Sequence, residues 1–450
     1  MSFLSKYKDV FVIFTSTILY FLFAYFLERT EFYTLVFLWF SLFGCFYYFI
    51  KSNTLNTSTL IGLTVLFRLI FLFSIPNLSQ DFYRFIWDGR MILEGLNPYL
   101  SLPETFIQQG LHPIAESSNL YNGMGEMNGS HYTNYPPINQ LCFLIAALFA
   151  SKSIFGSIIV LRLLIIFADI GILYFGKKLL ERLKLPIKNI FWYALNPFII
   201  IEMTGNLHFE PVMLFFLIWS LYKLHQQKWF WAAILLACSV SVKLIPLLFL
   251  PLFYQWFVKN EERWFKGLQK LFVFYTLVFI TIIVLFIPFY SSELIANYSN
   301  SVGLWFRNFE FNASFYFIFR EIGYLFRGYN EIAVIGKITP ILTILFLLYT
   351  TFFSKGKTLI QLTTLCLFGL CFYYFTSTTI HPWYLATPLI LSIFTKYRFP
   401  IIWTLVIILS YQAYANNPWK ENLWFVTLEY LIVYGYMIYE IKKNRNIIKL

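Results

Sequence analysis

The chain has 450 residues, of which 59% are hydrophobic and only 12% are charged. Such a composition excludes a soluble globular domain and indicates a polytopic membrane protein. The net charge of +12 does not indicate a nucleic-acid partner. Most Lys and Arg residues lie in short connections between apolar runs, where the positive-inside rule places them on the cytoplasmic side.

Apolar runs of about 17–25 residues recur along the chain, and this is the length that a helix needs to cross the hydrocarbon core. We therefore predict an all-α, multi-pass integral membrane protein with about 12–14 transmembrane helices. Basic clusters at 177–188, 259–270 and 442–449 mark cytoplasmic ends. The stretch 138–152 is predicted as a partial or interfacial helix, because a full crossing would carry the first of these clusters to the outer side. The other predicted spans lie near residues 10–27, 32–50, 57–76, 156–176, 190–203, 207–224, 229–241, 244–257, 269–290, 334–352, 357–375, 383–395, 399–416 and 422–440.

The polar segment 77–136 follows the third span and is predicted to be extracytoplasmic. It begins with SQDFYRFIWDGRMILEGLNPY. If this stretch is helical, Asp81 and Asp88 lie on one face, two turns or about 10 Å apart, with Arg84 between them. That arrangement suits a site that handles a hydroxyl and a phosphate.

The two aspartates have different alternatives. Asp81 lies where an apolar span ends, among aromatic residues that lower the local dielectric constant and raise its basicity, so we predict it as a general base. Its alternative role is a helix N-cap. For Asp88, a role in the chemistry and a local ion pair that shapes the loop are equally good alternatives, since Arg84 lies four residues earlier and Arg90 two residues later.

Other polar residues fall at the outer ends of their predicted spans, which favours a single site. His208 and Glu210, in NLHFEP, either contact a sugar, a phosphate or a divalent ion, or are simply solvated. Lys243 has apolar residues on both sides and either snorkels or meets an anion such as a polyprenyl phosphate. HPWY, at 381–384, offers a histidine that titrates near neutral pH beside an aromatic platform for a sugar.

The remaining features are less specific. Asp169 is predicted to be a helix-packing partner, and Arg68 to reach a lipid phosphate. The segment 291–333 is predicted to be a second extracytoplasmic, interfacial segment. The five cysteines show no metal or disulfide spacing and are predicted to be buried packing residues: Cys45, Cys142, Cys238, Cys366 and Cys371.

In chain order, the motifs are DxxRFxWDGR at 81–90, GxNPY at 95–99, YPP at 135–137, NLHFEP at 206–211, KLIPLLFLP at 243–251 and HPWY at 381–384. This order resembles the polytopic mannosyltransferase-like proteins of the GT-C glycosyltransferase superfamily. It is most similar to bacterial homologues of the enzymes that extend glycosylphosphatidylinositol anchors and to polyprenyl-phosphate-mannose-dependent α-mannosyltransferases. The resemblance covers residues 77–385.

The resemblance implies a single GT-C-like transmembrane domain over residues 1–450, in the inner membrane of a bacterium. The implied reaction is the inverting transfer of a hexose, by expectation mannose, from a polyprenyl-phosphate-sugar to a lipid, glycan or protein acceptor on the extracytoplasmic face. Asp81 matches the acidic residue of the first outer loop that serves as general base in such families. The residues expected to bind substrate are Arg84, Asp88, Arg90, Asn97, Tyr99, Tyr135, His208, Glu210, Lys243, His381, Trp383 and Tyr384.

The chain departs from some relatives because Asp81 is followed by Phe82 rather than by a second acidic residue. This departure puts a bound divalent metal in doubt, although Glu210 or Asp88 is able to supply another carboxylate.

Two other functions stay open. A transporter or flippase of lipid-linked sugars would share the fold but should show internal repeats and polar residues near the midplane. A non-catalytic subunit of a glycan-assembly complex is favoured if Asp81 is dispensable.

Overall fold

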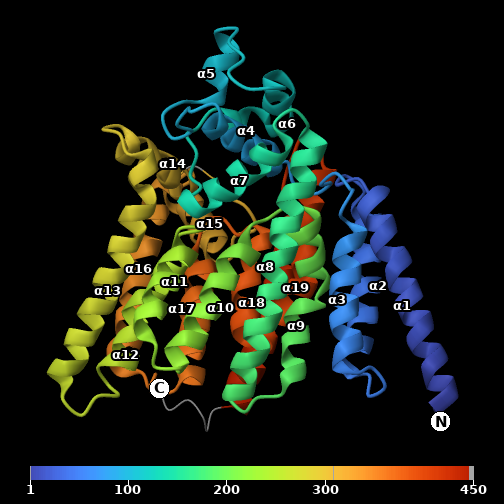
Figure 1. Cartoon of the computed structure of the whole chain (residues 1–450), viewed down its shortest axis with the longest axis vertical. Coiled ribbons are helices and arrows are strands. Elements are labelled where there is room, and N and C mark those ends of the chain that lie inside the picture. Colours follow the sequence, from blue (N-terminus) through green and yellow to red (C-terminus); the bar gives the residue numbers. More distant parts are fainter. Residues whose placement is uncertain (1, 308, 445–450) are drawn as a thin grey trace. The chain divides into compact units, whose positions relative to one another are not determined.

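The computed structural model describes residues 2–307 and 309–444, and these residues form helices and an isolated bridge but no strand (Figure 1). The prediction of an all-α fold is therefore confirmed. Residue 308 of the segment 291–333 and the end of the basic tail, 445–450, lie outside the described residues.

The helices are α1 (Ser2–Tyr25), α2 (Phe32–Lys51), α3 (Thr57–Ile70), α4 (Asp81–Leu93), α5 (Pro103–Gln108), α6 (Ser117–Gly129), α7 (Pro137–Ala150), α8 (Ile154–Arg182), η1 (Ile187–Ile190), α9 (Phe191–Ala194), η2 (Ile199–Gly205), α10 (Glu210–His225), α11 (Trp229–Val240), η3 (Ile245–Leu252), α12 (Phe253–Phe257), α13 (Trp264–Phe286), η4 (Ile287–Phe289), α14 (Leu294–Arg307), α15 (Phe315–Arg327), α16 (Ile332–Phe353), α17 (Leu359–Thr376), η5 (Pro382–Leu385), α18 (Ala386–Ser392), α19 (Phe399–Val406), η6 (Ile407–Ala415) and α20 (Leu423–Lys443). Of the η elements, η2 is a π-helix and the others are 3₁₀ helices.

Six of the described helices are long and apolar enough to cross a membrane, or seven if the bent pair η2 and α10 forms one span. The multi-pass prediction is thereby confirmed. The expected number of about 12–14 spans exceeds this count, because several predicted spans are short or broken apolar helices: α3, α11, η3 with α12, and α19 with η6. The predicted partial helix at 138–152 corresponds to α7.

The chain forms two compact units. Unit 1 comprises Met1–Tyr174, Lys188–Phe215 and Leu285–Ser301, and unit 2 comprises Phe175–Ile187, Phe216–Val284 and Val302–Leu450. The predicted domain 1–450 thus contains two units, and its second interfacial segment, 291–333, is divided between them.

In unit 1, the helices of the segment 77–136 lie beyond one end of the apolar helices α1, α2 and α3 (Figure 1). α4 packs against α6 and α7. The Phe85 and Phe143 rings of α4 and α7 stack with their centroids 4.7 Å apart. A Cβ atom built on Gly89 would lie 2.2 Å from the main-chain oxygen of Phe143. Only glycine permits this close approach, which fixes α4 on α7.

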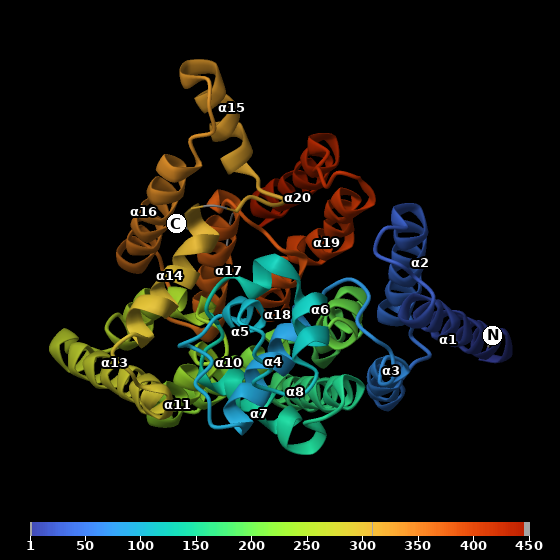
Figure 2. The same cartoon turned by 90° about the horizontal axis from the view of Figure 1, so that it is seen from above.

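In unit 2, α16 packs along α17, α19 packs along α20, and α15 packs on α16 and α17 (Figure 2). The segment before α15 pairs with the segment after α17. The Phe311 amide donates a hydrogen bond to the Thr378 carbonyl (3.2 Å), and the Ile380 amide donates to the Phe311 carbonyl (2.8 Å). These bonds join two connections that are far apart in the sequence.

The close packing of α4 on α7 predicts that a larger side chain at Gly89 destabilises the protein. We expect Gly89→Ala to lower the thermal unfolding midpoint of the purified protein, because overpacking a close contact costs about 1–3 kcal/mol. Gly62→Ala in α3 is the matched control, since no atom lies within 4 Å of a Cβ built there, and it should preserve or raise the midpoint. The measurement is intrinsic fluorescence during heating in detergent, and equal midpoints for both variants would contradict the proposed constraint.

Candidate active site

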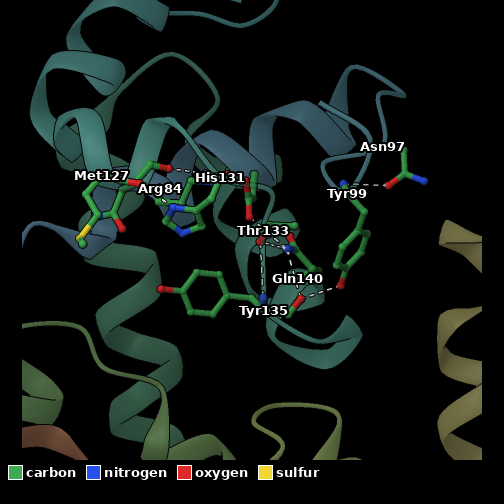
Figure 3. A network of polar contacts seen from close by, with 10 residues as sticks. Arg84, Asn97, Tyr99, Met127, His131, Thr133, Tyr135 and Gln140 are labelled. Carbon is green, nitrogen blue, oxygen red and sulfur yellow. Dashed lines mark hydrogen bonds and ion pairs between the residues drawn. The ribbon is translucent and has the colours of Figure 1, made fainter. Parts of the chain in front are cut away.

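Arg84 and Asp88 form a buried ion pair at the centre of the segment 77–136. The Arg84 Nε lies 2.8 Å from the Asp88 Oδ1, and the two side chains are 3% and 0% exposed. The Gln140 Nε2 of α7 donates to the other Asp88 oxygen at 3.0 Å. Gln140 also donates to the Thr133 hydroxyl at 3.0 Å (Figure 3). The local ion pair considered for Asp88 is thus present within α4, and the hydrogen bond from Gln140 ties α4 to α7.

Arg84 also holds the connection that follows α6. Its Nη1 donates to the main-chain oxygens of Asn128 and His131, at 2.5 and 3.0 Å. Burial, followed by the charge of Arg84, lowers the pKa of His131 to about 4. His131 is therefore neutral at physiological pH and adds no charge beside Arg84.

Arg90 and the GxNPY motif fix the rest of the segment. Arg90 lies 3.1 Å from the Glu116 carboxylate, which also accepts a hydrogen bond from the first amide of α8. The Asn97 side chain donates to the Phe289 carbonyl at 2.9 Å, and the buried Tyr99 hydroxyl donates to the Tyr135 carbonyl at 2.6 Å (Figure 3). Three of the expected substrate-binding residues therefore hold protein groups in this structure.

Tyr135 belongs to the YPP motif, and carboxylates from distant parts of the sequence act on its hydroxyl. Its ring packs edge-on against Phe85, with centroids 5.0 Å apart. Burial raises the pKa of the Tyr135 hydroxyl well above its usual value, and the nearby carboxylates of Asp81, Asp88 and Glu210 raise it further. Tyr135 is thus protonated at neutral pH and carries a polar hydrogen among carboxylates.

Asp81 is the first residue of α4, and the N-cap position belongs to Gln80. The expected alternative of an N-cap aspartate is therefore not what the structure contains. The Asp81 Oδ1 accepts a hydrogen bond from the Asn128 side chain at 3.3 Å. Asp81 is partly exposed, whereas Asp88 and Glu210 are buried.

The NLHFEP turn lies inside unit 1. His208 and Glu210 are only 1% and 2% exposed, which rules out the alternative that they are simply solvated. The turn separates η2 from α10, whose axes differ by 113°. The His208 Nε2 lies 3.9 Å from the Glu202 carboxylate, which is fully buried in η2. Sequence reasoning missed Glu202, although a glutamate in an apolar run was a usable signal.

One buried arginine supports the start of this turn, and a second is paired with a buried aspartate of a neighbouring helix. Arg162 of α8 donates to the Thr204 and Gly205 carbonyls at the end of η2, at 2.9 and 3.0 Å. Arg68 of α3 pairs with Asp169 at 2.8 Å and is 1% exposed. The predicted packing role of Asp169 is confirmed. The prediction that Arg68 reaches a lipid phosphate is wrong, because its guanidinium is enclosed by protein.

The other expected site residues belong to unit 2. The His381 ring stacks on Trp383, with centroids 4.5 Å apart and planes 3° apart, and it also stacks on Phe309 and Phe311. Burial, followed by the charge of Lys243, lowers the pKa of His381 to about 3. The prediction that His381 titrates near neutral pH is therefore wrong. One face of Trp383 is covered by this stack.

The structure thus collects the expected residues into two groups. Unit 1 holds Asp81, Arg84, Asp88, Arg90, Asn97, Tyr99, Tyr135, His208 and Glu210; unit 2 holds Lys243, His381, Trp383 and Tyr384. Besides Glu202, sequence reasoning missed Asn128, Gln140 and Glu116, which are uncharged or lie in polar loops and carry no spacing signal. Among the described residues, no group of three or more His, Cys, Asp or Glu side chains is arranged to hold a metal ion.

These features define a multi-pass helical membrane protein with a charged, largely buried polar cluster beside its apolar helices. The family model described as alpha-(1→6)-mannopyranosyltransferase, N-terminal domain, matches residues 11–259. Since this match covers more than half of the chain, the protein belongs to that family of mannosyltransferases (EC 2.4.1.-). The resemblance to GT-C mannosyltransferases is thereby confirmed. The matched region contains Asp81 and Lys243 but not HPWY. No curated protein sequence matches the chain.

The buried ion pair predicts strong coupling in a double-mutant cycle. Removing Asp88 alone leaves the Arg84 charge buried without its carboxylate, so Asp88→Ala should lower stability by about 3–5 kcal/mol. The double variant Arg84→Ala/Asp88→Ala should be more stable than the sum of the single effects predicts. Unfolding in detergent, followed by fluorescence, measures each variant.

The control is the pair Arg327–Glu331, which has the same i,i+4 spacing and in which the arginine is 64% exposed and the glutamate 12% exposed. Arg327→Ala should change stability by less than about 1 kcal/mol. Additive effects of the Arg84 and Asp88 substitutions would show that the two charges do not support each other.

Proposed function

We propose that the protein transfers mannose from a polyprenyl-phosphate-mannose donor to a hydroxyl of a lipid, glycan or protein acceptor, on the extracytoplasmic face of the bacterial inner membrane. Family membership supports the mannosyl transfer. The observation that supports the site is the exposure of Asp81, which is partly exposed at the start of α4 and bonded to Asn128, whereas Asp88 and Glu210 are buried.

In this proposal Asp81 acts as the general base. It accepts the proton of the acceptor hydroxyl while the hydroxyl oxygen attacks the anomeric carbon, and the polyprenyl phosphate leaves from the opposite face. Inversion of a β-linked donor then gives the α linkage that the family is named for. A lipid phosphate leaves readily as an anion, so a separate acid catalyst is not required.

The protein groups around Asp81 have positioning roles in this scheme. The Asn128 amide, 3.3 Å from Asp81, orients the carboxylate, and Arg84 holds the Asn128 carbonyl. Lys243 belongs to unit 2, where it is flanked by apolar residues and half-buried, and it is proposed to pair with a lipid phosphate.

The sidedness of the site is supported by contacts within unit 1. Lys188 belongs to the basic cluster 177–188, and its ammonium lies 3.5 Å from the Ser52 carbonyl in the connection between α2 and α3. α4 follows the opposite end of α3. If the basic cluster is cytoplasmic, the segment 77–136 is on the outer side.

The direct test of the catalytic proposal is Asp81→Asn. We expect it to reduce transfer of radiolabelled mannose from polyprenyl-phosphate-mannose by at least about 100-fold, which is the usual contribution of a general base. Membranes with equal amounts of wild-type and variant protein are compared. Glu94→Gln, at an exposed carboxylate just after α4, is the matched control and should retain activity. Full activity of Asp81→Asn would remove the base from this position.

The membrane side is tested by cysteine labelling. In a variant without the native cysteines, Asn122→Cys, at an exposed position of α6, should react with a membrane-impermeant maleimide added to intact cells. Lys259→Cys, exposed in the connection before α13, should react only after the membrane is opened. The reverse pattern would place the segment 77–136 in the cytoplasm.

A further inference from the structure

Unit 2 contains a small pocket between α16, the end of α17 and η5. Its volume is about 40 Å³, which is several times the roughly 10–15 Å³ that one water requires on this measure. The pocket is lined by Gly336, Thr339, Pro340, Tyr373, Thr376, Ser377, Thr378, Thr379 and Tyr384. It is therefore large enough for one edge of a ring-shaped ligand but not for a whole lipid-linked sugar.

The lining has a distinct chemical character. Seven of the nine lining residues carry a hydroxyl group, and none of the nine is a Lys, Arg, His, Asp or Glu. A phosphate would call for charged or amide donors, which pair with it most strongly. Hydroxyl groups both donate and accept hydrogen bonds, and tyrosine rings offer apolar faces. Together these groups match a neutral ligand with several hydroxyls.

The threonine wall of the pocket is held in place by the segment before α15. The Thr379 hydroxyl donates to the Phe309 carbonyl at 2.8 Å, next to the main-chain bonds that join Phe311 to Thr378 and Ile380. Hydroxyl groups on a fixed backbone recognise a ligand at a lower entropic cost than groups on a mobile loop.

That segment is itself anchored from both of its sides. The Asn312 amide donates to the Glu421 carboxylate at 2.6 Å, and the Asn312 side chain donates to the buried Glu429 at 3.2 Å. The Tyr430 hydroxyl donates to the Asn312 carbonyl at 2.7 Å. Asn312 has a positive φ of 46°, a conformation that asparagine tolerates better than most residues. The pocket wall is thus preorganised.

Two of the lining residues, Tyr373 and Tyr384, are aromatic. The Tyr384 ring stacks on Tyr374, with centroids 5.8 Å apart, and the Tyr374 hydroxyl donates to the Tyr384 carbonyl at 3.3 Å. Tyr384 belongs to HPWY, the motif for which a sugar contact was expected. Hydroxyl groups and tyrosine rings therefore line the same pocket.

We propose that this pocket is a hexose subsite that binds the hydroxyl-bearing edge of a mannopyranose ring. The inference rests on the proposed mannosyl transfer for the identity of the sugar, and it assigns recognition to residues outside the matched region 11–259. The same chemistry fits the sugar of the donor and a terminal mannose of the acceptor.

Binding is tested without requiring catalysis. Saturation-transfer NMR of methyl α-D-mannopyranoside is recorded on the purified full-length protein in detergent. Thr339→Val and Thr378→Val keep the shape of each side chain but remove its hydroxyl, and each should weaken binding about fivefold, the effect of losing one hydrogen bond. Thr378→Ser, which keeps the hydroxyl, should bind like the wild type.

Thr350→Val is the matched control, because Thr350 is a buried threonine of α16 that bonds to the Leu347 carbonyl and does not line the pocket. It should leave binding unchanged. Equal signals for the wild type and both pocket variants, or no signal from the wild type, would overturn the subsite. An effect of Thr350→Val equal to that of the pocket variants would also overturn it.

Failure of the proposed function gives a different result. If no variant or wild-type protein transfers mannose, yet binding depends on Thr339 and Thr378, the subsite stands and the catalytic proposal falls. If transfer occurs, kinetics distinguish the two substrates. A raised KM for polyprenyl-phosphate-mannose in Thr378→Val assigns the subsite to the donor, and a raised KM for methyl α-D-mannopyranoside as acceptor assigns it to the acceptor.

Discussion

Unit 1 depends on the hydrogen bonds that Arg162 donates to main-chain carbonyl groups. Its guanidinium lies 2.8–3.0 Å from four carbonyl oxygens, where the chain leaves α3 and where η2 ends: Leu72, Ser74, Thr204 and Gly205. Helices that stop among apolar helices leave carbonyl groups that water cannot reach, and each costs several kcal/mol unless a donor is supplied. One side chain supplies these donors, so the chain can turn sharply before Glu210.

The charged residues of unit 1 have different roles according to whether they are buried or partly exposed. Asp88 and Arg84 are fully enclosed and are compensated by each other and by Gln140, so they hold α4, α7 and the Asn128 connection together. Asp81 lies two turns before Asp88 on the same helix but is partly exposed. The ordered ion pair therefore fixes the geometry, while the accessible carboxylate remains available for a proton. Glu202 and His208, 3.9 Å apart, form another buried polar pair of unit 1.

Several predictions for site residues depended on the three-dimensional surroundings of a side chain, which the spacing of residues along the sequence does not determine. Asp169 was correctly predicted to be a packing residue, but its partner, Arg68, was expected at a lipid phosphate because both outcomes fit an arginine in an apolar run. His381 was expected to titrate near neutral pH, since that is the usual property of the side chain. Its aromatic neighbours Phe309 and Phe311 come from a segment about 70 residues earlier, and their burial of the ring removes that property.

The sequence by itself determined the helical, multi-pass class and the family, because long apolar runs permit no other spanning structure and the ordered motifs are local. It placed Asp81 and Asp88 on one face only on the condition that their segment is helical, and the structure supplied that helix, Asp81–Leu93. The tertiary structure alone decided which charges pair, where helices break and which hydroxyls line a pocket. Those outcomes depend on contacts between segments far apart in the chain, such as Asp88 with Gln140 and Phe311 with Thr378.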